Sequence, residues 1–117
     1  MGKHMLYEIR NYHFDPERFD AYKDWARNEA LPFLDRELDL VGFWANTGEA
    51  SEVNGAPMDA MGSANITWVI RWPDRETRDA TMKSVFTGEA WGKIFANVPG
   101  GMDSYKRMES KFTEALL

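Results

Sequence analysis

The chain has 117 residues, of which 44% are apolar and none is cysteine, and its formal net charge at pH 7 is −5. This length supports one domain with one core, and the lack of cysteine excludes disulfides and thiolate metal sites. The acidic charge and the absence of a long apolar stretch argue against nucleic-acid and membrane partners. We expect one cytoplasmic domain over residues 5–112, preceded at residues 1–4 by what resembles an expression scar.

The first predicted element is a strand over residues 6–12, where β-forming side chains alternate between two faces. Residues 15–17 (Asp-Pro-Glu) then indicate the start of a helix, because Asp caps free N–H groups and Pro suits the first turn. Aromatic and alanine residues recur at helical spacing over residues 19–33. Pro32 lies inside this stripe and predicts an interruption of the helix near Ala30.

Two further strands are predicted over residues 40–45 and 66–72. The segment between them, residues 46–63, is small, polar and rich in glycine, and it is too long for a tight hairpin. Segments of this kind are usually functional or mobile. Met58 and Met61 in this segment are candidates to cap an apolar ligand, or are incidental residues of a disordered loop.

Asp74, which follows Pro73, predicts the start of the second long helix. The residues expected on its solvated face are Arg75, Glu76, Arg78 and Asp79, and those expected to face the core are Ala80, Val85 and Phe86. A break at residues 87–89 precedes a short second helix, which a Pro-Gly-Gly stop ends. A fourth, more polar strand is predicted over residues 104–112.

The order of the elements is β-α-β-β-α-β, which predicts an α+β, ferredoxin-like fold with both helices on one face of a four-stranded antiparallel sheet. The first and third strands are expected to be central. The other face has no cover within the chain, and we expect it to carry Leu6, Glu8, Arg10, Tyr12, Leu40 and Trp44. Because a large exposed apolar patch signals association, a homodimer in the form of a dimeric α/β barrel is expected.

Several short motifs resemble the NIPSNAP family, and together they span most of the chain. They are residues 7–12 (Tyr-Glu-Ile-Arg-Asn-Tyr), 25–32, 42–44 (Gly-Phe-Trp), 72–76 and Trp91. The resemblance implies a dimeric α/β barrel, a fold shared by small enzymes and by proteins that only bind. The segment over residues 46–63 is longer than the usual connection of the family, so a role as a lid would be particular to this protein.

The candidate functional residues begin with Glu8, Arg10 and Tyr12 at alternate positions of the first strand. Arg10, or Arg71 on the third strand, is expected to hold a substrate carboxylate or enolate, and Tyr12 or Glu8 to transfer a proton. The alternative is a structural salt bridge between Glu8 and one of the arginines. Because a shift of one residue exchanges the two strand faces, the pattern leaves open which face of this strand lines the barrel.

Three further residues are candidates. His13, at the junction of strand and helix, is an acid–base candidate or a surface histidine, Trp44 is a candidate wall, and Asn65 a substrate-binding residue. A metal site is not expected, because the chain offers one usable histidine and no cysteine. Neither predicted helix contains histidine, which argues against the haem chemistry of some proteins of similar fold.

These residues predict a cofactor-independent enzyme of the isomerase, lyase or monooxygenase type, acting on a small, partly apolar and carboxylated molecule. The alternative is a non-catalytic binding or assembly module of the NIPSNAP type, whose polar barrel residues serve only the dimer.

Overall fold

The computed structural model describes residues 5–117, so the predicted scar at residues 1–4 lies outside the described part of the chain. Its strands form one sheet in the order β2-β3-β1-β4, and every neighbouring pair is antiparallel. The strands are β1 (Leu6–Phe14), β2 (Leu40–Ala45), β3 (Ile66–Trp72) and β4 (Tyr105–Thr113). β1 and β3 are central, and the ferredoxin-like α+β prediction is confirmed.

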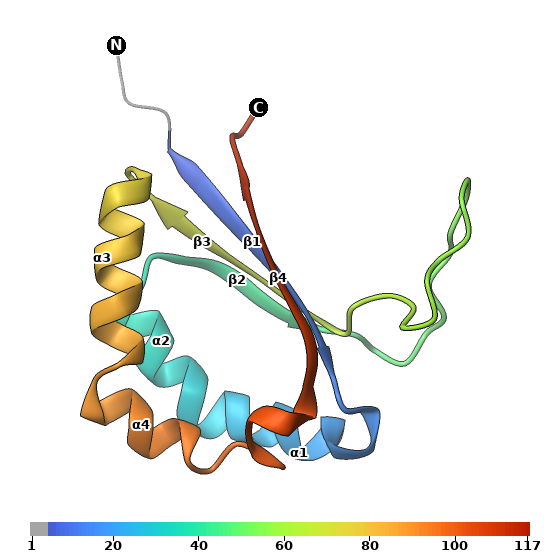
Figure 1. The fold of residues 1–117 in the computed structure, drawn as a ribbon, viewed down its shortest axis with the longest axis horizontal. Coiled ribbons are helices and arrows are strands. Elements are labelled where there is room, and N and C mark those ends of the chain that lie inside the picture. Colours follow the sequence, from blue (N-terminus) through green and yellow to red (C-terminus); the bar gives the residue numbers. More distant parts are fainter. Residues whose placement is uncertain (1–4) are drawn as a thin grey trace.

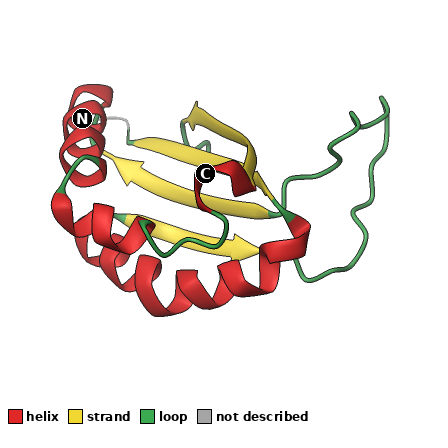
Figure 2. Ribbon diagram, turned by 60° about the horizontal axis from the view of Figure 1, so that its bottom comes forward, coloured by secondary structure: helices red, strands yellow, loops and turns green. Residues whose placement is uncertain are grey.

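The helices gather on one side of the sheet, as Figures 1 and 2 show. They are α1 (Phe19–Trp25), α2 (Leu31–Glu37), α3 (Arg75–Phe86) and α4 (Glu89–Phe95), with short turns at Pro16–Arg18 and Gly101–Ser104. Among residues 5–117, no helix lies over the opposite face of the sheet. Within the described residues, no helix is long and apolar enough to cross a membrane.

The predicted interruption before Pro32 is a turn of π-helix, Ala26–Ala30, which separates α1 from α2. There the N–H of Leu31 donates to the carbonyl of Ala26, five residues earlier. Proline has no N–H to donate, so a regular α-helix would lose a hydrogen bond at this point. The wider turn absorbs the irregularity and lets the apolar stripe continue from α1 into α2.

The faces of β1 differ from the prediction. Glu8, Tyr12 and Phe14 are buried beneath the helices, and the side chains of the alternate residues, such as Ile9, point to the uncovered face. The expected uncovered-face residues that lie on the helix side instead are Leu6, Glu8, Arg10, Tyr12 and Leu40. Trp44 does lie on the uncovered face, 52% exposed. Both faces of β1 mix apolar and polar side chains, so alternation alone does not identify the buried one.

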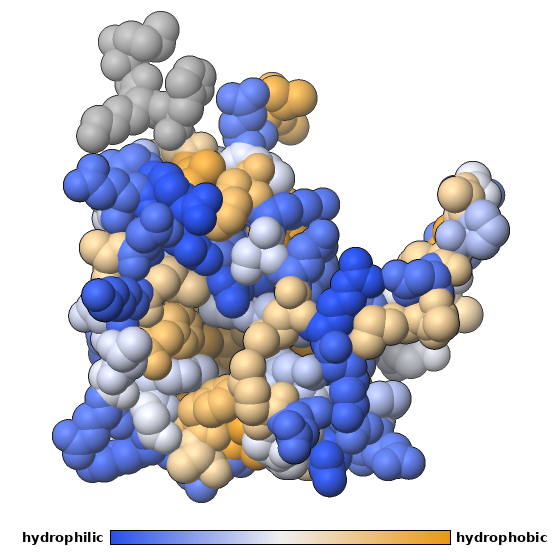
Figure 3. All heavy atoms as spheres, viewed as in Figure 1, coloured by the Kyte–Doolittle hydropathy of each residue, from blue (hydrophilic) through white to orange (hydrophobic). Residues whose placement is uncertain are grey.

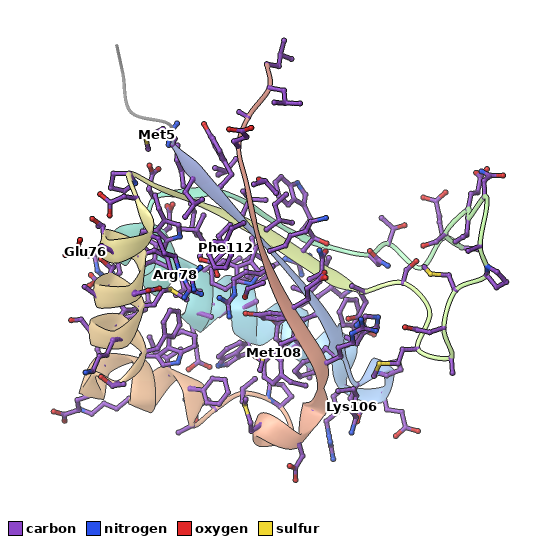
Figure 4. All side chains as sticks on the ribbon, turned by 45° about the horizontal axis from the view of Figure 1, so that its top comes forward. Met5, Glu76, Arg78, Lys106, Met108 and Phe112 are labelled. Carbon is purple, nitrogen blue, oxygen red and sulfur yellow. The ribbon has the colours of Figure 1, made fainter. Side chains whose placement is uncertain are left out.

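The start of α3 confirms the predicted cap, because the Asp74 carboxylate accepts a hydrogen bond from the N–H of Thr77 at 2.7 Å. The predicted faces of this helix are partly wrong. The Arg78 side chain is only 17% exposed and reaches a buried carboxylate on β1, whereas Ala80 is exposed. Figure 4 shows Arg78 pointing from α3 toward the interior of the molecule, while Glu76 points away from it.

Residue pairs on β3 test which face of the sheet is the core. Ile70 is fully buried and its neighbour Arg71 is exposed on the other face. We expect Ile70→Ala to lower the free energy of unfolding by about 2–5 kcal/mol, because it leaves a cavity. Arg71→Ala should cost far less than Ile70→Ala, because it removes contacts of an exposed side chain, chiefly the ion pair with Asp39. Urea denaturation measures both, and equal losses would contradict the assignment of the faces.

Candidate functional site

A cavity of about 870 Å³ lies between the helix-covered face of the sheet and the helices. Figure 3 shows it as a recess with apolar atoms around it, beside α3. Aromatic side chains from both layers form most of its wall: Trp25, Phe43, Trp68, Phe86, Trp91 and Phe95. Thioether groups of Met82, Met102 and Met108 complete the apolar surface. A wall of this composition suits a partly apolar, planar ligand.

The polar end of the cavity is built on Glu8, whose side chain is fully buried. Its carboxylate accepts hydrogen bonds from Trp72 Nε1 at 3.0 Å, from Arg78 Nη2 at 2.7 Å and Nε at 3.1 Å, and from Arg10 Nη1 at 2.7 Å. Burial alone would raise the pKa of Glu8, but the hydrogen bonds from Arg78 and the charge of Arg10 outweigh it and lower the pKa. Glu8 is therefore a satisfied carboxylate that holds two guanidinium groups in place.

Arg10 lines the cavity next to this carboxylate. Its Nε donates to the Tyr12 hydroxyl at 2.7 Å, and its guanidinium carbon lies 5.3 Å from the centre of the Trp68 ring. The contacts to Glu8 and Tyr12 fix the plane of the guanidinium. Its second terminal nitrogen, Nη2, makes no hydrogen bond to any residue of 5–117, so it remains available to a ligand.

Tyr12 is one of three tyrosines that line the cavity, with Tyr22 and Tyr105. The ring centres of Tyr12 and Tyr105 are 5.6 Å apart, and those of Tyr22 and Tyr105 are 6.2 Å apart. Burial raises the pKa of the Tyr12 hydroxyl, and the charge of Arg10 offsets part of that effect. Burial likewise raises the pKa of Tyr22 and Tyr105. All three phenols are therefore neutral near pH 7. Tyr22 shares a hydrogen bond with Tyr105, so the hydroxyls of Tyr12 and Tyr105 are the ones that can donate to a ligand oxygen.

The Trp68 indole is a further polar group at this end. Trp68 is 3% exposed, and its Nε1 is buried with no partner in hydrogen-bond geometry among the described residues. It lies close enough to Tyr12 to lower the pKa of that hydroxyl. A buried donor without a partner is uncommon in folded proteins. It adds one more N–H to the donors that converge on the polar end.

The local sequence explains this convergence. Alternation along β1 puts Glu8, Arg10 and Tyr12 on one face, and β3 is paired so that Trp68 faces Arg10 and Trp72 faces Leu6. The capped first turn of α3 then places Arg78 above the same face. The aromatic ring of Phe112 on β4 supports this arrangement, 5.0 Å from the Arg78 guanidinium carbon.

The other predicted site residues lie elsewhere. His13 is on the uncovered face, where its Nε2 lies 3.0 Å from the carbonyl oxygen of Gly62. Arg71 is exposed on that face and pairs with Asp39 at 2.9 Å. Trp44 is on that face too, with its ring over Gly42, where a Cβ atom would collide with it. The structure thus separates these three residues from Glu8, Arg10 and Tyr12.

Asn65 has a backbone role. Its amide oxygen accepts from the N–H of Phe14 and its amide nitrogen donates to the carbonyl of Phe14, both at 2.9 Å. These two bonds extend the pairing of β1 beyond Ile66, the first residue of β3. The side chain is therefore fully used within the fold.

Sequence reasoning missed Arg78, Trp72 and the pair Tyr22 and Tyr105. Glu8 offered the one indication of the role of Arg78, because a carboxylate buried on a central strand needs a cationic partner from a helix that covers the sheet. Its position among other charged residues on α3 hid it. Among residues 5–117, no group of histidine, aspartate and glutamate side chains could hold a metal ion.

The Glu8 carboxylate generates a stability prediction. We expect Glu8→Gln to lower the free energy of unfolding by about 3–5 kcal/mol at pH 7, because it leaves two arginines without their buried counter-charge. Since the folded-state pKa of Glu8 is below its ordinary value of 4.5, this contribution is present above about pH 4.5 and is lost as the pH falls through the folded-state pKa. Urea denaturation from pH 3 to pH 7 measures it.

The matched control is Glu109→Gln, which changes a carboxylate exposed on the uncovered face. It should leave the free energy of unfolding within about 0.5 kcal/mol of the natural protein. A gap between Glu8→Gln and the natural protein that does not narrow in acid would contradict the role given to the carboxylate.

No protein-family model matches the chain, and no curated protein matches its sequence. Solved structures match its fold. A NIPSNAP family protein of unknown function from Agrobacterium tumefaciens is 20% identical, covers 98% of this chain and 91% of its own, and superposes with a TM-score of 0.74. A second NIPSNAP family protein from that bacterium is 12% identical, with coverage of 98% and 89% and a TM-score of 0.75.

A putative antibiotic biosynthesis monooxygenase from Nitrosomonas europaea is also similar, with 11% identity, coverage of 99% and 94%, and a TM-score of 0.58. At these identities the similarity concerns the fold. The resemblance to the NIPSNAP family predicted from the sequence is confirmed at that level: this chain has the fold of NIPSNAP family proteins.

Proposed function

We propose that this protein binds a small, partly apolar molecule bearing a carboxylate or a carbonyl in the cavity beneath its helices, and that it acts as a cofactor-independent enzyme. The observation that carries the proposal is the pairing of an aromatic wall with one available guanidinium nitrogen, on Arg10, at its polar end. The ligand's apolar part would lie against Trp25 and Trp91, and its oxygen atoms would face Arg10.

The chemistry that this end supports best is stabilisation of an enolate or phenolate oxygen. Arg10 supplies a fixed positive charge and Tyr12 a neutral phenol, and both are set before any ligand binds. Donors fixed in advance toward a developing negative charge lower the barrier to forming that anion when solvent water takes the proton next to the carbonyl. Isomerisation, elimination and oxygenation by dissolved dioxygen all pass through such an anion. The description of one solved neighbour as a putative monooxygenase supports the third of these.

Glu8 has a positioning role in this proposal. Its four hydrogen bonds and lowered pKa make Glu8 a poor base. Its hydrogen bond with Arg10 orients that guanidinium toward the cavity. Tyr12 is the proposed proton donor, with Tyr22 and Tyr105 behind it. His13 lies across the sheet from the cavity, so proton transfer by His13 in this reaction would need a ligand on the other face.

A non-catalytic binding module is the second candidate. The cluster of Glu8 with Arg10 and Arg78 that orients the site also satisfies every charge it buries, as a purely structural ion pair would. In that case Arg10 would still recognise a ligand anion, but no group would transfer a proton. The two candidates differ in the effect of Tyr12→Phe.

We also propose that the uncovered face of the sheet binds a second copy of the chain. Trp44 on β2 is 52% exposed, near the half-buried Ile9 and Val69 of the central strands. An exposed apolar area in the middle of the sheet face that carries no helix favours association, and a two-fold dimer is the commonest form that association takes.

A thermal-shift screen of small carboxylates and hydroxylated aromatic compounds tests binding. A ligand at about 100 times its Kd should stabilise the natural protein by about 2.7 kcal/mol. The shift should vanish in Arg10→Ala and persist in Arg71→Ala, whose arginine lies on the other face. A shift that survives Arg10→Ala would contradict the proposed site.

Once a ligand is identified, turnover that is lost in Tyr12→Phe while binding persists indicates an enzyme. Unchanged turnover in this variant excludes Tyr12 as the proton donor.

The proposed homodimer is tested by Val69→Arg, which puts a charge at the centre of the uncovered face. Analytical ultracentrifugation should find twice 13.5 kDa for the natural protein and a single 13.5 kDa chain for the variant. The control is Ala80→Arg, which adds the same charge on the exposed side of α3. An unchanged mass for Val69→Arg would contradict this interface.

A further inference from the structure

The connection between β2 and β3 is far longer than its ends require. Ala45 pairs with Ile66, and the N–H of Asn46 donates to the carbonyl of Asn65 at 2.9 Å, so two residues after Asn46 would close the hairpin. The chain instead uses residues 46–65, which we call the arm. Figures 1 and 2 show the arm extending from the end of the sheet, away from the helices and from the body of the domain.

The arm is acidic and exposes several large apolar side chains. It contains Glu49, Glu52 and Asp59 and no lysine or arginine, so it carries three of the negative charges in the protein. Every residue from 46 to 61 is exposed. These include Val53 at 48%, Met58 at 46% and Met61 at 43%. Large apolar side chains on an extended segment are costly to expose, and close to half of each of these three stays open to solvent, although Met58 borders a hollow that His13 and Arg107 also line.

Only the returning part of the arm is fastened to its own domain. The carbonyl of Gly62 lies 3.0 Å from His13 Nε2, and Asp59 pairs with Arg107 Nη1 at 2.8 Å. These contacts hold the base of the arm against the ends of β1 and β4 on the uncovered side. The outward part, residues 47–57, passes beyond the sheet. The base therefore directs the tip away from its own domain.

The uncovered face carries three cations on β3 and β4. Arg71, Arg107 and Lys111 point to it, against Glu109 of the same strands and against Asp39, which pairs with Arg71 at 2.9 Å. With Arg107 paired to Asp59, Lys111 is the cation of these strands on this face for which no ion pair is seen within residues 5–117. The pair between Arg107 and Asp59 shows, within one chain, that arm and face are complementary. The remaining acids, Glu49 and Glu52, lie on the outward part of the arm and can meet the same surface only on another molecule.

We propose that the arm of each copy clasps a second copy of this chain, its tip lying against the partner beside the paired sheet faces. The proposal rests on the homodimer proposed above. Clasping covers Val53 and the methionines, brings Glu49 and Glu52 toward a face on which Lys111 has no acidic partner within residues 5–117, and accounts for the length of the arm. It also makes His13 the hinge residue of the clasp, because its ring binds the carbonyl at the point where the arm returns.

The absence of cysteine makes a direct test possible, because one introduced thiol is the only site of labelling. Val53→Cys, labelled with a benzophenone maleimide and irradiated, should give a covalent dimer of twice 13.5 kDa. The control is Ala90→Cys, exposed on α4 on the helix side, which should stay at one chain. A dimer with no cross-link from Val53→Cys above this control would overturn the clasp.

A second variant separates failure of the clasp from failure of the dimer. Replacing residues 47–64 with Asn-Gly closes the hairpin directly and leaves both sheet faces intact. We expect the dimer dissociation constant, from ultracentrifugation, to rise at least about tenfold while far-ultraviolet circular dichroism is unchanged. An unchanged dissociation constant overturns the clasp and keeps the homodimer. A natural protein that is monomeric at every concentration overturns both.

Discussion

The interaction on which the site depends is the burial of one carboxylate, Glu8, between two arginines. A lone carboxylate in this position would lose its charge, because desolvation raises its pKa. Arg10 and Arg78 reverse that outcome and are themselves held in fixed planes. The ion pair orients Arg10 toward the cavity and joins α3 to the sheet. One interaction therefore shapes both the polar end of the cavity and its roof, which is formed by α3 and α4.

Besides this ion pair, α3 and α4 are held by partly buried apolar side chains and by a hydrogen bond from Trp25 Nε1 to the carbonyl of Ile94 at 3.0 Å. No residue of α3 or α4 is fully buried, although Met82, Phe86, Trp91 and Phe95 pack against the core from above the cavity. A tightly packed core at this place would leave no room for a ligand. The ion pair between Arg78 and Glu8, supported by the Phe112 ring, fixes the position of α3 relative to the sheet. The space between helices and sheet therefore does not have to be filled by side chains. Stability at this point and an open cavity are thus compatible.

The two faces of the sheet bear similar types of residue in different surroundings. Aromatic side chains on the helix side surround a recess, whereas Trp44 on the other side lies flat over Gly42, on an open surface. Basic residues likewise divide between Arg10, which is partly buried beside a carboxylate, and Arg71, which pairs with Asp39 at the surface. The chemistry available to each residue follows from its face, and the same side chain in the neighbouring position would do something else.

The sequence by itself determined the elements, because their signals are local. The β-forming run of β2, the cap at Asp74 and the interruption before Pro32 each depend on residues within one turn or one strand. It also selected Glu8, Arg10 and Tyr12 as a group, since they share one face of β1. Only the tertiary structure decided that this face lies under the helices, that Arg78 completes the group, and that His13 and Arg71 lie across the sheet. These facts depend on pairing between residues far apart in the chain, and a strand with mixed side chains on both faces carries no local signal for them.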